Sequence, residues 1–200
     1  REVKLGCEWQ AERIYRPNAL TLEYARYRVG DSPWSVREPL WQIYEAMRST
    51  RMEADFEIEY AFEVGEMPSG PVYLAVECPT WWKVFVNGQP VAHEQGERWF
   101  DVSFRKVEIT PLLKEKGNIV RMAGRFGRGS EIESCYILGD FGVEMPSLRI
   151  VREPCTVTCG DLVAQGYPFF SGIVGLRQEV ELPSQDGRAF LVLDGLQATM

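Results

Sequence analysis

Residues 81–91 have the sequence WWKVFVNGQPV, and this stretch decides the fold that we predict. Asn87 and Gly88 stand between two apolar runs, and both tolerate the positive φ angles of a two-residue turn. The stretch is therefore predicted to form a β-hairpin. Because Pro90 has no backbone N–H, the returning strand is expected at the edge of its sheet or at its own end.

Alternation of apolar and polar residues predicts further strands on both sides of the hairpin. Residues 56–64 alternate except at Ala61, and residues 72–78 repeat the pattern after a Pro-Ser-Gly break. A period of two is typical of a strand with one buried and one solvent-facing side. Other strands are predicted at residues 20–29, 99–109, 118–126, 134–143, 173–182 and 189–194. The expected fold is all-β, an antiparallel β-sandwich.

One helix is predicted near residues 35–52. Leu40, Ile43, Tyr44 and Met47 follow the three-to-four-residue spacing of an apolar helix face. A single helix before a run of antiparallel strands suits a sandwich that the helix covers.

The chain is predicted to contain a β-sandwich domain at 18–150, then a linker and the first strands of a truncated second sandwich at 151–200. Residues 62–77 and 178–194 share a strand, a Pro-Ser-Gly turn and a second strand. Strands without partners must pair elsewhere. We therefore expect residues 155–200 to form a homodimer contact or to fold back on the first sandwich. The alternative is chance similarity, because Pro, Ser and Gly are common in turns.

Composition narrows the classes of partner. The 200 residues are 45% hydrophobic and 26% charged, which is typical of a folded domain. The net charge of −7 argues against nucleic acid, since phosphate binding relies on clustered Lys and Arg. No run approaches the roughly 18 apolar residues of a membrane span. Neutral sugars or other proteins suit this surface better.

The cysteines do not suggest a metal site or a disulfide framework. Their number is odd: Cys7, Cys78, Cys135, Cys155 and Cys159. Cys155 and Cys159 lack a second ligand pair, and His93 is the only histidine, so no metal or other cofactor is expected. Unpaired cysteines lean toward a reducing compartment, the bacterial cytoplasm.

Several short motifs resemble a known family. They are KVFVNG at 83–88, Phe100-Asp101, Ile109-Thr110, Leu113-Lys114 and Gly117-Asn118. This succession resembles the sugar-binding, galactose-binding-like jelly-roll domain of glycoside hydrolase family 2 and of related bacterial glycosidases such as α-L-rhamnosidases. The resemblance covers roughly residues 54–200 and consists of turn and packing signatures. It implies a jelly-roll sandwich whose partners are carbohydrate and a catalytic domain of the same parent chain.

Carbohydrate sites combine aromatic faces, which pack on ring C–H groups, with planar polar side chains that bind hydroxyls. The candidate ligand-binding residues are Trp81, Trp82, Trp99, Asp101, Arg125 and Glu133. Neighbouring strand residues face opposite sides, so one of Trp81 and Trp82 is expected to point inward. The outward one is the better ligand candidate. Core packing is the alternative for each tryptophan.

No catalytic arrangement is recognisable. Among 29 Asp and Glu residues, carboxylate pairs are unavoidable; Glu57, Glu59 and Glu63 share a strand side and are expected to be solvated. A catalytic triad would need His93, which is expected on the surface. The chain is therefore expected to be a non-catalytic carbohydrate-binding or accessory module of a larger bacterial glycoside hydrolase. The alternatives are a purely structural module that packs against a catalytic domain, and a small β-sandwich glycosidase or lyase.

Overall fold

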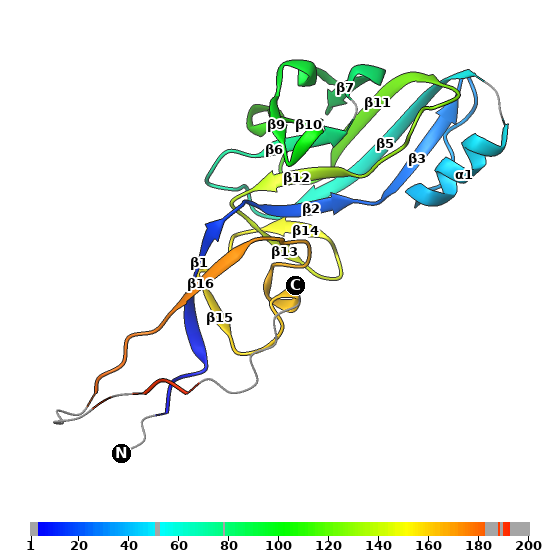
Figure 1. Cartoon of the computed structure of the whole chain (residues 1–200). Helices are drawn as coiled ribbons and strands as arrows, with labels where there is room; N and C mark the ends of the chain where they lie inside the picture. Colours follow the sequence, from blue (N-terminus) through cyan, green and yellow to red (C-terminus); the bar gives the residue numbers. More distant parts are fainter. Residues whose placement is uncertain (1–3, 51–52, 78, 183–187, 189, 193–200) are drawn as a thin grey trace.

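The computed structural model describes residues 4–50, 53–77, 79–182, 188 and 190–192. Strands dominate these residues, and a single α-helix accompanies them. The strands form two facing sheets and a third, smaller sheet that projects from one end (Figure 1). The predicted all-β sandwich is confirmed.

The first facing sheet has five antiparallel strands. Their order is β2 (Asn18–Leu22), β12 (Cys135–Gly139), β6 (Tyr73–Glu77), β10 (Asp101–Glu108) and β9 (Glu97–Trp99). Strands distant in sequence are neighbours here, as Ile137 lies between Leu20 and Leu74.

The second facing sheet is built around β5. Its order is β13 (Gly142–Glu144), β14 (Arg149–Val151), β5 (Ala54–Val64), β11 (Asn118–Phe126), β7 (Trp82–Val86) and β8 (Gln89–Val91). β3 (Tyr24–Val29) also pairs with β5, and β4 (Glu38–Pro39) pairs with β3. Only the short contact between β14 and β5 is parallel.

The core lies between these two sheets. The apolar residues of β5 are buried as the alternation predicts, with Phe56, Ile58 and Tyr60 at most 1% exposed. They meet Leu74 and Ile137 from the first sheet in one cluster. The period-two pattern therefore identified the buried side of β5 correctly.

The polar side of β5 differs from expectation. Glu63 is exposed, whereas Glu57 and Glu59 are only partly exposed. Glu57 pairs with Arg28 at 2.6 Å, and Glu59 pairs with Arg26 at 2.6 Å, both from the neighbouring strand β3. The predicted solvated row was wrong for these two glutamates because the sequence pattern does not reveal which charges lie opposite each other on adjacent strands.

The hairpin predicted at residues 81–91 is present. Asn87 and Gly88 have φ angles of 51° and 82°, as a tight hairpin turn requires, and join β7 to β8. Pro90 lies in β8, which is the last strand of its sheet. Its missing N–H therefore breaks no central ladder.

The helix α1 (Leu40–Thr50) begins later than predicted. The preceding residues are extended, and β4 pairs with β3. Pro39 disfavours a helical conformation at Glu38, which delays the start of the helix. Leu40, Ile43 and Met47 are buried beside the sandwich, as the spacing predicts. The predicted end at 51–52 lies outside the described residues.

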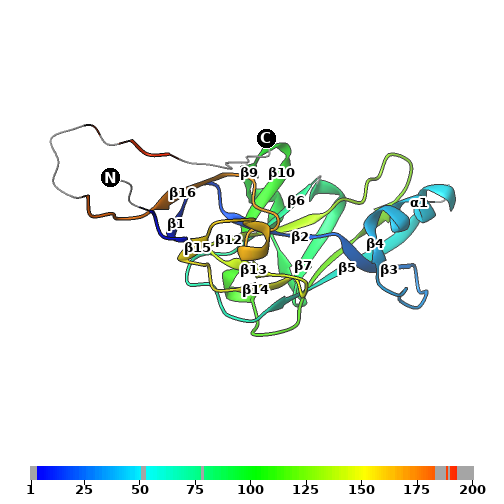
Figure 2. The ribbon, with the colours of Figure 1, turned by 90° about the horizontal axis from the view of Figure 1, so that it is seen from below.

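The third sheet combines one strand from the N-terminal part of the chain with two from the C-terminal part. β1 (Glu8–Tyr15) lies between β15 (Thr156–Thr158) and β16 (Ile173–Arg177). It lies at the opposite end of the molecule from α1 (Figure 2). The strand predicted over 173–182 thus ends at Arg177. The one predicted over 189–194 is absent at 190–192, and its remaining residues lie outside the described part.

Residues 155–177 therefore find partners within the chain, on a strand that the sequence did not place. The second sandwich and the homodimer contact stay predictions. Four 3-10 turns complete the described structure: η1 (Pro79–Trp81), η2 (His93–Gln95), η3 (Thr110–Leu112) and η4 (Val163–Gln165).

Candidate functional site

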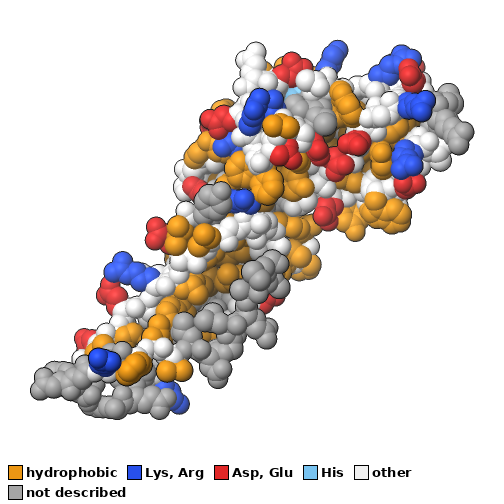
Figure 3. Space-filling view, viewed as in Figure 1, with side chains coloured by type: hydrophobic (Ala, Val, Ile, Leu, Met, Phe, Trp, Pro, Cys, Tyr) orange, Lys and Arg blue, Asp and Glu red, His pale blue; other side chains and the backbone are white. Residues whose placement is uncertain are grey.

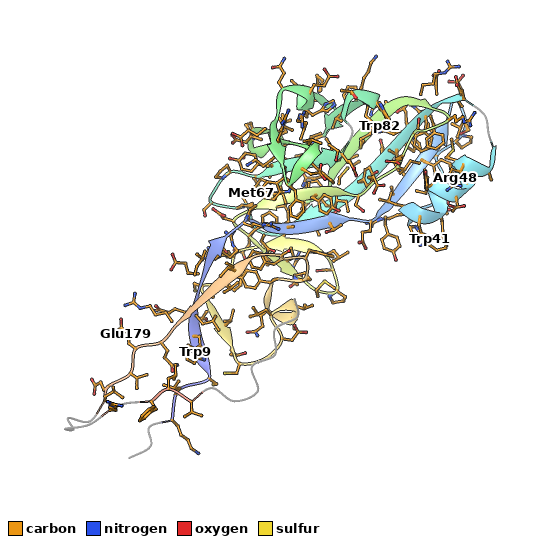
Figure 4. All side chains as sticks on the ribbon, in the orientation of Figure 1. Trp9, Trp41, Arg48, Met67, Trp82 and Glu179 are labelled. Carbon is orange, nitrogen blue, oxygen red and sulfur yellow. The ribbon has the colours of Figure 1, made fainter. Side chains whose placement is uncertain are left out.

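The adjacent tryptophans separate at the start of β7. Trp82 is 5% exposed and its ring lies 6.0 Å from that of Phe56 in the core. Trp81, the last residue of η1, is 43% exposed. Trp82 therefore cannot offer its ring to a ligand, and its expected ligand role gives way to core packing (Figure 4). Trp81 keeps the outward position.

Gly124 of β11 allows this arrangement. A Cβ atom at Gly124 would lie 2.5 Å from the carbonyl oxygen of Trp81 and 3.0 Å from the ring of Trp82. Any larger residue would push β7 and its two tryptophans away from β11.

Three carboxylates gather beside Trp82. Glu77, Glu131 and Glu133, here called the acidic rim, line a hollow of about 10 Å³ whose wall includes Trp82. Burial raises the pKa of Glu133, and the nearby charges of Glu77 and Glu131 raise it further. The backbone of Glu133 is fixed by Tyr60, whose hydroxyl donates a hydrogen bond to the Glu133 carbonyl at 2.9 Å. The hollow has room for about one water molecule, so a larger ligand would lie across the rim.

Asp101 joins the acidic rim through Ser103. The Ser103 hydroxyl lies 2.6 Å from Asp101 Oδ1 and 3.1 Å from Glu77 Oε1. Hydrogen bonds from the Ser103 side chain and backbone lower the pKa of Asp101. One hydroxyl carries one proton, and the shorter contact favours donation to Asp101. Glu77 therefore keeps acceptor capacity for a hydroxyl that approaches from outside.

Trp99 lies next to Asp101 but faces a cation. The two residues are paired between β9 and β10, and Lys106 Nζ lies 5.3 Å from the centre of the Trp99 ring. Lys106 also lies 4.5 Å from the ring of Tyr73. One face of the half-buried Trp99 is thus occupied by a cation–π contact.

Arg125 does not join the acidic rim through any described contact. Its exposed side chain forms an ion pair with Glu53 at 3.5 Å, near the end of β11. Glu77 and Ser103, by contrast, belong to the site and were not predicted. Glu77 ends a mostly apolar strand, and Ser103 is one of several polar residues of β10, so neither stands out in the sequence. Only the pairing of β6 with β10 brings them together.

Two wider hollows lie elsewhere. One, of about 530 Å³, lies between α1 and the loop after β11, with Tyr44, Arg48 and Arg128 in its wall. The other, of about 350 Å³, lies between β2 and β5 and includes Tyr24 and Arg37.

His93 is not the surface histidine that the sequence suggested. It is 4% exposed, and its Nδ1 lies 2.9 Å from the Val91 carbonyl oxygen. The 3-10 turn after β8 folds the ring inward, which the polar sequence of this loop does not reveal.

In the part of the chain that the structure describes, no three His, Cys, Asp or Glu side chains are placed to hold a metal ion. No described helix is long and apolar enough to cross a membrane.

Comparison of the chain with protein-family models, with curated proteins and with solved structures finds no match.

Proposed function

We propose that this chain is a non-catalytic carbohydrate-binding module, an accessory part of a larger glycoside hydrolase. The observation that carries the proposal is the exposed ring of Trp81. Its neighbour Trp82 lines the hollow that the acidic rim, Glu77, Glu131 and Glu133, also lines. The resemblance of the hairpin and turn motifs to glycosidase sugar-binding domains supports the same class of ligand.

The chemistry of this end suits a neutral polyol. An exposed indole face packs on sugar C–H groups, and carboxylate oxygens accept hydrogen bonds from hydroxyls. Glu77 has acceptor capacity to offer, because Ser103 donates preferentially to Asp101. A neutral ligand also avoids the repulsion that an anion would meet at three carboxylates. On the face seen in the space-filling view, apolar and acidic side chains lie side by side over the sandwich (Figure 3).

Titration calorimetry of the whole chain with neutral mono- and oligosaccharides tests the proposal. We expect saturable heat from at least one sugar, and a loss of binding of at least tenfold in Trp81→Ala, since stacked aromatic rings contribute strongly to binding. Trp41→Ala is the matched control. Trp41 is 65% exposed on α1, apart from Trp82, and its variant should bind normally (Figure 4).

A further variant tests whether sugar binds at the acidic rim or in the hollow between β2 and β5. If Tyr24→Ala abolished binding while Trp81→Ala retained it, the proposed site would be wrong although the ligand class would stand. Absence of heat with every sugar would contradict the proposed function itself.

A purely structural module is the second candidate, and a specific patch favours it. Phe100, between β9 and β10, and Val102, in β10, are 75% and 72% exposed. Exposed apolar side chains of this size are typical anchors of protein interfaces. If the module is purely structural, neither the unaltered chain nor its variants should bind sugar. Phe100→Ser should then weaken association with the catalytic domain of the parent chain, as measured in a pull-down.

A further inference from the structure

Two cysteines that are far apart in the sequence lie opposite each other in the third sheet. β1 and β15 are antiparallel, with Glu8 opposite Thr158 and Trp9 opposite Val157. The next pair outward is Cys7 and Cys159, and the Cys159 amide donates to the Cys7 carbonyl at 3.1 Å. Side chains of directly opposed residues project from the same face of a sheet.

The separation suits a disulfide. Opposed residues in a hydrogen-bonded antiparallel pair have Cα atoms about 5.5 Å apart, inside the range of roughly 4.4 to 6.8 Å that disulfides span. Their Cβ atoms need to approach by about 1 to 2 Å, because the Cβ atoms of a hydrogen-bonded pair lie about 5.5 Å apart and those of a disulfide roughly 3.8 Å apart. The pair stands at the end of the ladder, where such an adjustment disturbs few other hydrogen bonds.

A glutamine side chain holds the backbone beside each cysteine. Next to Cys7, Gln178 accepts from the Gly6 amide at 3.1 Å and donates to the Glu8 carbonyl at 2.7 Å. Beside Cys159, Gln165 accepts from the Thr158 amide at 2.7 Å and donates to its carbonyl at 3.1 Å. Both strands are thus positioned before any bond forms, which raises the effective concentration of the two thiols.

The other described cysteines are poor competitors. Cys155 lies opposite Ala11, four residues from Cys159 along one extended strand, or about 13 Å. Cys135 is buried in the sandwich, and burial raises its pKa to about 12. Cys7 and Cys159 are both exposed.

We infer that Cys7 and Cys159 are a modification site, at which a low-molecular-weight disulfide such as oxidised glutathione converts them into an intrachain disulfide. The thiolate of one cysteine attacks the reagent, forms a mixed disulfide and releases one glutathione thiolate. The second cysteine thiolate attacks the protein sulfur of this mixed disulfide and releases the second. The two protein thiols are oxidised, the reagent is reduced to two thiols, and the two cysteine protons pass to the released thiolates. The bond ties β1 to β15, independently of any sugar site.

The test treats the whole chain with oxidised glutathione, blocks the remaining thiols with N-ethylmaleimide under denaturing conditions, and maps peptides without reduction. We expect a monomer with two fewer blocked cysteines and a linked peptide pair that contains Cys7 and Cys159. The oxidised chain should also melt at a higher temperature than the reduced chain. Cys155→Ser and Cys78→Ser should both form the link.

Cys7→Ser and Cys159→Ser should lose the link and carry glutathione on the remaining cysteine. They should also show no rise in melting temperature on oxidation. Unchanged circular dichroism of these two variants establishes that they fold. A link between Cys155 and Cys159, covalent dimers through Cys7, or mixed disulfides alone in the unaltered chain would each overturn the inference.

Discussion

Asn87 donates a hydrogen bond from Nδ2 to Oδ1 of Asn118 at 2.8 Å, which ties the tight turn of the hairpin to the start of β11. Asn87 also accepts from the Ile119 amide at 3.0 Å and donates to the Leu112 carbonyl at 2.7 Å. Asn118 is fully buried and binds the backbone of Lys114 with both its oxygen and its nitrogen. The turn residue is therefore part of a polar network, beyond its tolerance of positive φ.

Asn118→Ala should destabilise the fold by about 3 kcal/mol, because buried backbone groups lose their partners. Asn118→Asp should also destabilise it, since its second oxygen would face the Lys114 and Lys116 carbonyls, which now accept from Nδ2. Urea unfolding measures both changes. Gln89→Ala, at an exposed position in the same hairpin, is the control and should change stability by no more than about 0.5 kcal/mol. Equal effects at the two positions would show that the network is unimportant.

Gly124→Ala should cost about 2 kcal/mol, because its Cβ would collide with the Trp81 carbonyl. The shift of β7 should also weaken sugar binding at Trp81. Gly117→Ala is the matched glycine change: the nearest atom to its new Cβ is Glu63 Oε1 at 3.9 Å. Thermal unfolding and calorimetry on both variants check this. A tolerated Gly124→Ala would mean that β7 and β11 can separate freely.

The raised pKa of Glu133 predicts a pH dependence of stability. A carboxyl group whose pKa is raised by folding binds its proton more tightly in the folded state. Stability therefore falls as pH rises through the ordinary glutamate range toward the raised value, and the penalty remains at higher pH. Glu133→Gln should remove this fall and raise the melting temperature at neutral pH.

Melting temperatures at a series of pH values and salt concentrations measure the effect of Glu133. Salt should reduce it, because the group is partly exposed and its repulsion by Glu77 and Glu131 is screened. Glu94→Gln, outside the acidic rim, is the control. A pH profile that Glu133→Gln leaves unchanged would contradict the assigned cause.

Arg13 links the third sheet to the sandwich, and its loss should loosen that sheet. Its side chain is 9% exposed and pairs with both Asp140, just after β12, and Glu153. Arg13→Ala should destabilise this junction by about 2 kcal/mol, because it leaves Glu153 partly buried without its partner. Arg177→Ala breaks an exposed pair with Glu179 and should change stability by less than about 1 kcal/mol. Hydrogen exchange of β1 amides should accelerate in the first variant alone; similar rates in both would refute the link.

Local pattern predicted most of the sandwich. Alternation in β5 identified Phe56 and Ile58 as core residues because the period of two is a property of the strand itself. The Asn-Gly turn was predictable for a similar reason, since few other residues adopt its φ angles. The start of α1 was predicted too early, because the pairing of β4 with β3 competes with helix formation there.

The candidate site was predictable only in part. Trp81, Asp101 and Glu133 were chosen for their side-chain chemistry, and contacts in the structure relate Asp101 and Glu133 to Glu77. Glu77 carried no signal of its own, and Trp82 could be assigned to the core only once the direction of β7 was known.

The sequence by itself determined most strands of the two facing sheets, the hairpin turn and the buried side of β5, because each follows from the conformational preferences of neighbouring residues. Tertiary structure alone decided which strands distant in the sequence pair. It placed β1 between β15 and β16, opposed Cys7 to Cys159, and brought Glu77 to Ser103. Such pairings join residues far apart along the chain, and their register depends on the packing of the whole fold, which no local pattern contains.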